Sequence, residues 1–462
     1  MKSGHCVKTL LCGFLFAAGV LAQDTARLLG TVTDQSGAAV TGAKITARNM
    51  ATGIERTTLA DSAGGYSIPL LPIGGYSITG EATGFKTTTL GGITLQVGQE
   101  ARVDIRLEIG ATSDSIDVTA AAPLLETDTS AVGQVIDSKA MANLPLNGRQ
   151  FWQLAQLTPG TVFTPGGQDI TSGGQGIRAS RVQLRISGNS RLSSGWLLDG
   201  FDITEYEQGG TSLAPSTDAL EEFRVLGGGM SAEYRLPSVI NAALKSGTNS
   251  FNGSLYEYIR NDKFQARNFF AQNVPELKRN EFGATLGGPI KRNRVFFFGD
   301  YEGSRTRQGS TQNSTVPTPA QLTGNFAGQR PIYDPLTTRV NPANASQFIR
   351  DPFPGNTIPA SSISPQAAYF LSWFPTPNAG RNQFVYSPAL ALDTDKFDIK
   401  ISSRLTNNDT LNGRYSYINN TENDVQGYPV LGTYPLHSRA QNAGLNYLHV
   451  ISPTMTADVS VS

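Results

Sequence analysis

Apolar and polar residues alternate with a period of two along much of the chain, as in β-strands whose two faces differ. Val103, Ile105 and Leu107 alternate with Asp104 and Arg106, so the three aliphatic side chains lie on one face. Similar runs, separated by turn signals, occupy residues 28–33, 44–49, 66–70, 76–83 and 92–97. About six or seven strands in roughly 80 residues predict a small β-sandwich, but their spacing does not identify a ligand.

A second alternating region lies nearer the C-terminus. Phe397, Ile399 and Ile401 alternate with Asp398 and Lys400, and the pattern resumes at residues 411–417 after a short turn. A transmembrane barrel strand has this pattern because one face meets lipid and the other the lumen. A soluble sandwich would show the same alternation, but not the long proline-rich excursion that we expect to be one extracellular loop at residues 305–394.

The N-terminus carries the features of a secretory signal peptide. Lys2 and Lys8 precede an apolar run that ends in small residues, which predicts cleavage after Ala22. The run is shorter than the roughly 20 residues that a membrane-spanning helix needs. Cys6 and Cys12 leave with this segment, so the mature chain has no thiol for a disulfide or a thiolate metal site.

The composition excludes several classes of function. The 37 basic residues balance the 37 acidic ones, so no net field favours nucleic acid. The 49 glycines indicate many turns, and no helical apolar stretch follows the signal, so membrane insertion would use β-strands. His437 and His449 lie too far apart for a helical zinc pair, and no nucleophile elbow is present. We therefore expect no catalytic residue, no metal site and no cofactor.

The first domain resembles a known module. The motifs that carry the resemblance are Gly30-Thr31-Val32, Asp34, Gly42-Ala43, Gly65-Tyr66 and Pro72-Ile73-Gly74-Gly75-Tyr76. In this order they are similar to carboxypeptidase regulatory-like domains. The resemblance implies a non-catalytic, transthyretin-like β-sandwich at residues 27–108, of a type grouped with carbohydrate-binding-like folds. Tyr66 and Tyr76 could stack on sugars, but aromatic residues on alternating strands favour the core.

An extended segment follows the sandwich in a setting of small residues. It consists of Asp114, Ser115, Ile116, Asp117, Val118, Thr119 and Ala120. A tethered strand can add to the sheet edge of a partner through main-chain hydrogen bonds. The segment resembles a TonB box, which implies TonB as its partner, while an ordinary linker or the first strand of the next domain remain the alternatives.

Residues 111–247 contain this box and a second ordered set of motifs. The set includes Asn147, Gly148, Arg149, Gly188, Asp199, Gly200 and Arg224. It is similar to the plug domain of TonB-dependent receptors, which implies a mixed α/β domain. Two departures are Ser187, where an arginine is usual, and residues 236–238, where a glycine pair is usual.

The remaining residues, 248–462, resemble the start of the barrel in the Oar-like subfamily of these receptors. The motifs include Phe251-Asn252-Gly253-Ser254, Leu286-Gly287-Gly288-Pro289 and Phe296-Phe297-Phe298-Gly299-Asp300. The whole chain is thus expected to be mainly β: a sandwich, a plug and an incomplete antiparallel barrel. Residues 455–462 stop in mid-strand, and barrels of this class close at about 22 strands, so we expect a fragment of a longer chain.

The resemblance implies an energy-coupled receptor in the outer membrane, in contact with lipid, with the sandwich and plug facing the periplasm. Its substrate is open, with an oligosaccharide or a peptide as candidate classes. Two alternatives remain: an adhesin or structural surface protein built from the same parts, and a secreted carbohydrate-binding module.

Overall fold

The computed structural model describes residues 25–111, 115–119, 131–163, 184–207, 209–211, 213–229, 234–267, 274, 276–309, 312–425, 429–452 and 455–462. The predicted signal peptide, residues 1–22, lies outside these residues. Within them, no helix combines the length and the apolar character needed to cross a membrane.

The N-terminal sandwich consists of two sheets. Its strands are β1 (Thr25–Thr33), β2 (Lys44–Asn49), β3 (Glu55–Leu59), β4 (Gly65–Pro72), β5 (Gly74–Glu81), β6 (Thr87–Leu95), β7 (Glu100–Arg102), β8 (Ile105–Arg106) and β9 (Ser115–Thr119). One sheet has the order β4-β1-β7, with β8 also on β1, and the other has the order β3-β2-β5-β6-β9. Aliphatic residues from both sheets form one core between them, as the alternation predicted.

Two details of the sandwich differ from the prediction. Strand β3 was missed because its sequence, Glu-Arg-Thr-Thr-Leu, is mostly polar. The predicted strand at residues 103–107 contributes only β8, although Val103, Ile105 and Leu107 are buried as expected. At this point the Asp104 carboxylate accepts hydrogen bonds from the backbone N–H and the hydroxyl of Thr31, both at 2.8 Å. Tyr66 and Tyr76 belong to the core, as the alternation favoured.

The central domain, residues 131–247, is built on a mixed sheet. The sheet has the order β10-β17-β18-β13-β14. Its strands and helices are β10 (Val132–Asp137), α2 (Ser138–Asn143), η2 (Phe151–Leu157), β13 (Ser194–Leu198), β14 (Phe201–Asp202), η5 (Thr217–Ala219), β17 (Leu220–Gly228) and β18 (Ser238–Leu244). Two short pairs add β11 (Thr161–Phe163) to β12 (Leu184–Ile186) and β15 (Thr204–Glu205) to β16 (Gly210–Thr211), and η4 covers Arg191–Ser193. Asp137 is the N-cap of helix α2, and its carboxylate accepts a hydrogen bond from the N–H of Ala140 at 2.7 Å.

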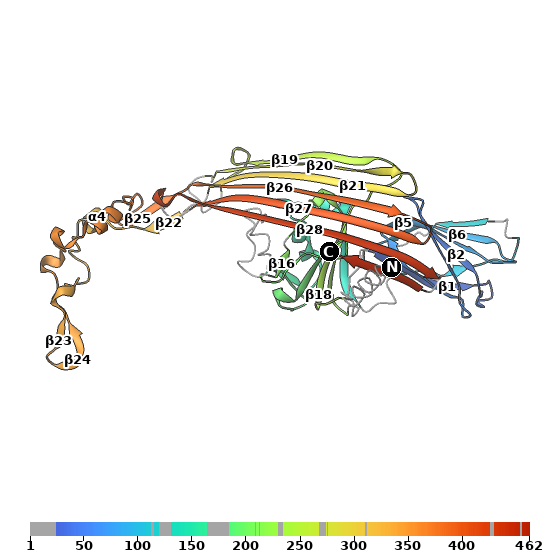
Figure 1. Ribbon diagram of the computed structural model, residues 1–462, viewed down its shortest axis with the longest axis horizontal. Coiled ribbons are helices and arrows are strands. Elements are labelled where there is room, and N and C mark those ends of the chain that lie inside the picture. The colour runs from blue at the N-terminus through green and yellow to red at the C-terminus, as the bar shows by residue number, and fades with distance from the viewer. Residues whose placement is uncertain are drawn as a thin grey trace, which may run out of the picture.

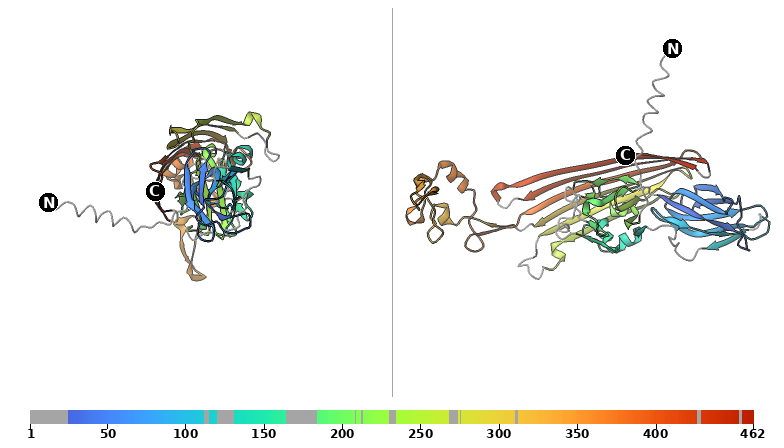
Figure 2. Two further views of the ribbon diagram at one scale, coloured as in Figure 1. Left: turned by 90° about the vertical axis from the view of Figure 1, so that its right-hand side faces the viewer. Right: turned by 90° about the horizontal axis from the view of Figure 1, so that it is seen from below.

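Seven long strands form an open antiparallel sheet that curves around the central domain (Figures 1 and 2). They are β19 (Asn252–Asn261), β20 (Leu277–Lys291), β21 (Val295–Gly309), β26 (Ala389–Arg404), β27 (Asp409–Val425), β28 (Thr433–Ser452) and β29 (Met455–Val461). Strands β19 and β29 are its edges among the described residues. The sheet therefore agrees with the expected incomplete barrel.

In the middle of β26, around residues 397–401, the two faces of this curved sheet have opposite polarity. In β26, Ile399 and Ile401 are 48% and 44% exposed on the outer face, whereas Asp398 and Lys400 are 2% and 8% exposed on the inner face. Phe397 also lies on the outer face, where its ring contacts Tyr417 of β27 at 5.1 Å between centroids. The sheet is thus inside out relative to a soluble protein, as predicted for strands between lipid and a polar lumen.

The excursion between β21 and β26 forms an arm at one end of the curved sheet (Figure 1). It covers residues 310–388, so the predicted loop at 305–394 was slightly too long. The arm contains β22 (Gln312–Thr315), α3 (Pro319–Leu322), β23 (Arg339–Asn341), β24 (Asn344–Ile349), α4 (Pro365–Leu371) and β25 (Gln383–Tyr386). Short 3-10 turns occur at Asp262–Phe264, Pro335–Thr337, Pro354–Asn356, Ala360–Ser362 and Pro429–Leu431. The sandwich lies at the opposite end, beside the short turns of the sheet (Figure 2).

Gly30 in β1 is a position where the sandwich has no space for a side chain. A Cβ atom there would lie 2.0 Å from the carbonyl oxygen of Val103, which also accepts the Tyr66 hydroxyl. We expect Gly30→Ala to destabilise the sandwich by about 1–3 kcal/mol, because the facing backbone must move. Chemical denaturation followed by circular dichroism measures this change. Gly75→Ala is the matched control, since a Cβ atom there would have no other atom within 4 Å, and an equal loss in both variants would contradict the packing argument.

Candidate functional site

The Asp199-Gly200 turn of the central domain joins that domain to the curved sheet. Asp199 and Gly200 have φ angles of +51° and +77° and connect β13 to β14, the geometry that an Asp-Gly hairpin favours. One Asp199 oxygen accepts the N–H of Leu244 at 2.9 Å and the Lys400 ammonium at 2.9 Å. The turn therefore presents a carboxylate to the inner face of the curved sheet.

The surroundings of this ion pair are closed to solvent. The side chains of Lys400 and Asp199 are 9% and 4% exposed. Arg414 of β27 approaches the second Asp199 oxygen at 3.9 Å, and its guanidinium lies over the Phe201 ring at 5.4 Å from the centroid. β28 passes so close to this ring that a Cβ on Gly444 would lie 2.5 Å from it. The pair is thus anchored in a packed interface.

A second contact between the central domain and the curved sheet is made by the loop at Asn147, Gly148 and Arg149. The side-chain oxygen of Asn147 accepts hydrogen bonds from Arg260 of β19 at 2.8 Å and from Arg279 of β20 at 3.0 Å. Arg149 forms an ion pair with Asp218 within the central domain. Its guanidinium also lies over the ring of Tyr258 on β19, 4.0 Å from the centroid. Both polar residues of the motif therefore contact the curved sheet.

A third joint surrounds Glu302 of β21, whose side chain is 1% exposed. Lys396 of β26 pairs with this carboxylate at 2.8 Å. The hydroxyl groups of Tyr256 and Ser216 donate to it at 2.9 and 3.1 Å. Ser216 belongs to the central domain, so this charged cluster also connects the two parts.

The sandwich contacts the central domain through the turn between β6 and β7. Arg224 donates to the carbonyl oxygens of Val97 and Gly98 at 3.3 and 2.8 Å. Glu222, two residues earlier on β17, accepts the backbone N–H of Val97. Burial raises the pKa of the Glu222 carboxyl to about 7, although the hydrogen bond from Val97 acts in the opposite direction. The central domain thus holds this turn with one acidic and one basic side chain.

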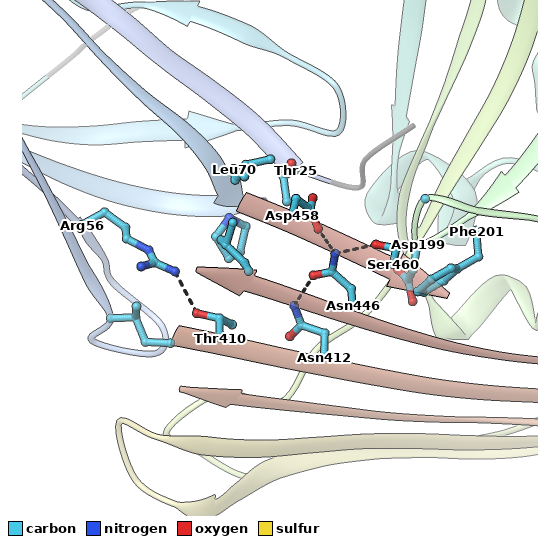
Figure 3. Close-up of a pocket in the computed structure, with 14 residues that line it drawn as sticks. Thr25, Arg56, Leu70, Asp199, Phe201, Thr410, Asn412, Asn446, Asp458 and Ser460 are labelled. Carbon is cyan, nitrogen blue, oxygen red and sulfur yellow. Dashed lines mark hydrogen bonds between the residues drawn. The ribbon is translucent and has the colours of Figure 1, made fainter. Parts of the chain in front are cut away.

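The sandwich also contacts the short-turn end of the curved sheet. Arg56 donates to the carbonyl oxygen of Asn407 at 3.3 Å and to the Thr410 hydroxyl at 2.8 Å, while Asn249 N–H donates to Ala51 at 3.0 Å. A cavity of about 60 Å³ lies where all three parts meet (Figure 3). In the wall of the cavity, the side-chain amide of Asn446 donates hydrogen bonds to the Asp458 carboxylate and the Ser460 hydroxyl. The cavity holds no convergent catalytic set, and among the described residues no cluster of three or more His, Cys, Asp or Glu side chains is arranged for a metal.

The predicted TonB box is only partly described. Asp114 and Ala120 lie outside the described residues, whereas Ser115, Ile116, Asp117, Val118 and Thr119 form β9. This strand pairs in parallel with β6, with Thr87 opposite Ser115 and Gly91 opposite Thr119. β9 therefore belongs to the sheet of the preceding sandwich. In this position the segment is neither a bare linker nor the first strand of the central domain.

The other motif residues have separate positions. Arg224 faces the sandwich, while Gly148 and Gly200 supply left-handed turns with φ of +71° and +77°. Gly188, with φ of +77°, is in an exposed turn. The partners Lys400, Glu302 and Glu222 were not predicted. The alternation places Lys400 on the polar face of a strand, but no sequence pattern identifies Asp199, 201 residues away, as its partner.

Comparison with known families assigns both ends of the chain. Residues 27–108 match the carboxypeptidase regulatory-like domain and residues 243–462 match the outer membrane beta barrel domain. The TonB-dependent transporter Oar of Myxococcus xanthus is 26% identical over 320 residues, which cover 65% of this chain and 28% of the relative. The chain is a homologue of this TonB-dependent transporter. The match to the outer membrane beta barrel domain indicates that this chain lies in the outer membrane.

Two receptors are among the solved structures that are similar to part of this chain. A mutant of the ferric enterobactin receptor from Pseudomonas aeruginosa, in complex with enterobactin, has 16% identity and a TM-score of 0.37, covering 70% of this chain and 41% of that one. The siderophore receptor PirA from Acinetobacter baumannii has 14% identity and a TM-score of 0.33, covering 69% and 44%. Because these values are low, no residue role is transferred from either receptor. The chain also spans only 28% of the length of Oar.

The buried pair between Lys400 and Asp199 leads to a stability prediction. We expect Lys400→Met to destabilise the protein by about 3–5 kcal/mol, because it leaves the Asp199 carboxylate buried without its closest cation. The double variant Lys400→Met with Asp199→Asn is expected to lose less than the sum of the two single changes, since the residues are coupled. Denaturant unfolding of the detergent-solubilised protein measures all three.

The control for this prediction is an ion pair of similar length at the surface. Arg339 and Asp351 in the arm lie 2.7 Å apart, with side chains 49% and 54% exposed. Arg339→Met should cost about 0–1 kcal/mol, because water already solvates both partners. Additive losses at residues 199 and 400 would show that the buried pair is not coupled.

The raised pKa of Glu222 predicts a dependence of stability on pH. The folded chain keeps a proton that the unfolded chain loses above its ordinary pKa of 4.5. The resulting stabilisation is fully present below pH 4.5 and is lost as the pH rises through 7, with a total of about 3 kcal/mol at most. The unfolding temperature of Glu222→Gln should therefore fall less than that of the unsubstituted protein between pH 5 and pH 8. Glu221→Gln, at an exposed neighbouring position, removes a charge that contributes to the raised pKa of Glu222 but keeps its burial, so it should retain most of the pH dependence. Identical profiles for all three proteins would exclude Glu222 as its source.

Proposed function

We propose that this chain carries the gate of a TonB-dependent outer-membrane receptor for an unidentified substrate, with the central domain as its plug. The observation that carries the proposal is the position of the central domain against the polar inner face of the curved sheet. Asp199, Asn147 and Ser216 each meet charged side chains of that face. A domain held there obstructs the lumen of the barrel to which the sheet belongs.

The chemistry of these joints suits a gate that opens. A buried ion pair is specific in geometry, yet its attraction is largely offset by the cost of removing both charges from water. If the plug shifts and water enters, Lys400 and Asp199 regain hydration, as do Lys396 and Glu302. An apolar joint of equal area would not recover free energy in this way. These polar contacts therefore help to hold the closed position, beside the apolar contact of Phe298 and Ile418, without making its opening prohibitively costly.

Work for such a movement has to come from the inner membrane, because the outer membrane maintains neither ATP nor an ion gradient. In the proposed mechanism, the segment Asp114–Ala120 binds TonB by adding as a strand to its sheet. A pull on that strand reaches the plug through residues 121–131, which precede β10. The role of the chain is then mechanical and non-enzymatic.

The orientation follows from the two ends of the curved sheet. Short turns of outer-membrane barrels lie on the periplasmic side and long loops lie outside. The turn at residues 405–408 and the sandwich would thus face the periplasm, and the arm would face the exterior. A protein so placed needs export, for which residues 1–22 are the proposed cleavable signal. Oligosaccharides and peptides stay open as substrates.

Deletion of Asp114–Ala120 from the full-length protein tests the energy coupling. We expect the deletion to abolish binding to the C-terminal domain of TonB, because it removes the main chain that forms the added strand. Surface plasmon resonance with the purified receptor in detergent measures the affinity. Uptake of a candidate substrate, once identified, should fall to the level of a TonB-depleted strain.

Deletion of residues 123–129 is the matched control, since it shortens the chain equally and keeps the box intact. This control should retain TonB binding. If the box deletion binds TonB undiminished, the energy-coupling assignment is wrong, and the alternative of a surface adhesin gains support.

A further inference from the structure

The edge of the sandwich holds the same strand that the proposed function assigns to TonB. β9 is the last strand of the sheet β3-β2-β5-β6-β9 and pairs only with β6 among the described strands. The register runs from Thr87 opposite Ser115 to Gly91 opposite Thr119. The main-chain groups on one side of the strand are therefore already engaged.

The connection between β9 and β6 has the features of a reversible one. β9 is five residues long, lies at a sheet edge and pairs in parallel. Parallel pairing is slightly less stable per residue than antiparallel pairing, and an edge strand is covered on one side only. By contrast, β6 is fixed on its other side by an antiparallel ladder to β5. β9 can thus leave while the sandwich remains folded.

The anchoring of the sandwich determines what a pull on β9 would achieve. The sandwich is attached to the curved sheet through Arg56 and to the central domain through the turn at Val97 and Gly98. While β9 stays in the sandwich sheet, a force applied to it is transmitted to these two attachments of the sandwich. It is not transmitted to the segment that leads to β10. The plug receives the force directly only after β9 has separated from β6.

We propose that the β6 edge, residues 87–91, is a strand-binding surface that sequesters the TonB box in the resting receptor, and that TonB competes with it for β9. This inference rests on the proposed function, because it takes Ser115–Thr119 as the TonB-binding strand. A receptor in which only a fraction of the molecules has β9 released binds TonB with an affinity reduced by that fraction. The sandwich thereby sets the threshold for engagement.

A disulfide between β6 and β9 tests the competition. Thr89 and Asp117 are Cα partners, and neighbouring strands are separated by a distance that a disulfide can bridge. The double variant Thr89→Cys with Asp117→Cys is made in the full-length receptor, in which residues 23–462 contain no other cysteine. We expect the oxidised protein to lose measurable binding to the TonB C-terminal domain, and reduction to restore it.

The matched control joins β6 to β5 and leaves β9 free. Thr79 and Thr89 are Cα partners whose hydroxyl oxygens lie 3.4 Å apart, so Thr79→Cys with Thr89→Cys places a disulfide in the same sheet. Its oxidised and reduced forms should bind TonB equally. A peptide of residues 110–122 should bind TonB more tightly than the reduced receptor, because no β6 edge competes for it.

Each result separates the inference from the function on which it rests. Absence of TonB binding by both the peptide and the reduced receptor would contradict the TonB-box assignment itself. If both bind and the oxidised β6–β9 variant binds equally well, TonB uses the free side of β9 and the competition is disproved. Failure of the two cysteines to join under oxidation would show that β9 is not paired with β6 in the resting receptor.

Discussion

The Lys400 ammonium is buried on the inner face of the curved sheet, and a charge so far from water is stable only beside an opposite charge. Asp199 supplies that charge from another domain. Phe397, Ile399 and Ile401 of β26 lie on the outer face, while Phe298 and Ile418 of the neighbouring strands add an apolar contact to the core of the central domain. Charge pairing and hydrogen bonds therefore act together with this apolar contact to position the central domain, and the curved sheet in turn depends on that domain to compensate the charge of Lys400.

Left-handed turns give this pairing its precision. Asp199 and Gly200 form a two-residue hairpin whose backbone leaves the carboxylate at the tip, and the N–H of Leu244 fixes one of its oxygens. Gly148 and Arg149 also have positive φ angles, and the loop places Asn147 between two arginines. A side chain on a tight turn loses little further freedom on docking, so the entropy cost of forming the joint is small. This explains why the motifs combine a polar residue with glycine.

The period of the sequence was sufficient to predict the apolar face of β26 around residues 397–401. The alternation through Phe397 and Ile401 predicted both the strand and its outward face, and the short turn after Arg404 predicted the antiparallel neighbour. Asp199-Gly200 forms its turn for a similarly local reason, although the sequence identified these residues only as part of the plug-like motif set. These features depend on residues close together in the chain, where sequence patterns act directly.

The partners across the domain joints were beyond such patterns. The contacts of Lys400 with Asp199 and of Arg224 with Gly98 join residues 201 and 126 positions apart, and many other polar residues have an equivalent local pattern. Strand β3 was missed for a related reason, since its Thr and Arg residues are polar and its position depends on pairing with β2. The parallel pairing of β9 likewise depends on which sheet edge is open, which is a property of the folded sandwich.

The order in which the strand pairings separate under force follows from their geometry. β9 is attached to the sandwich by five residues of parallel strand, whereas β10 is paired along its length with β17 in the core sheet of the central domain. A force applied near residues 114–120 acts on the pairing of β9 with β6 before it acts on β10. Strands β1 to β8 and the turns between them carry a buried core of their own, which includes Leu28, Ile45 and Ile78. The sandwich can thus release the strand and bind it again without unfolding, as a repeated transport cycle requires.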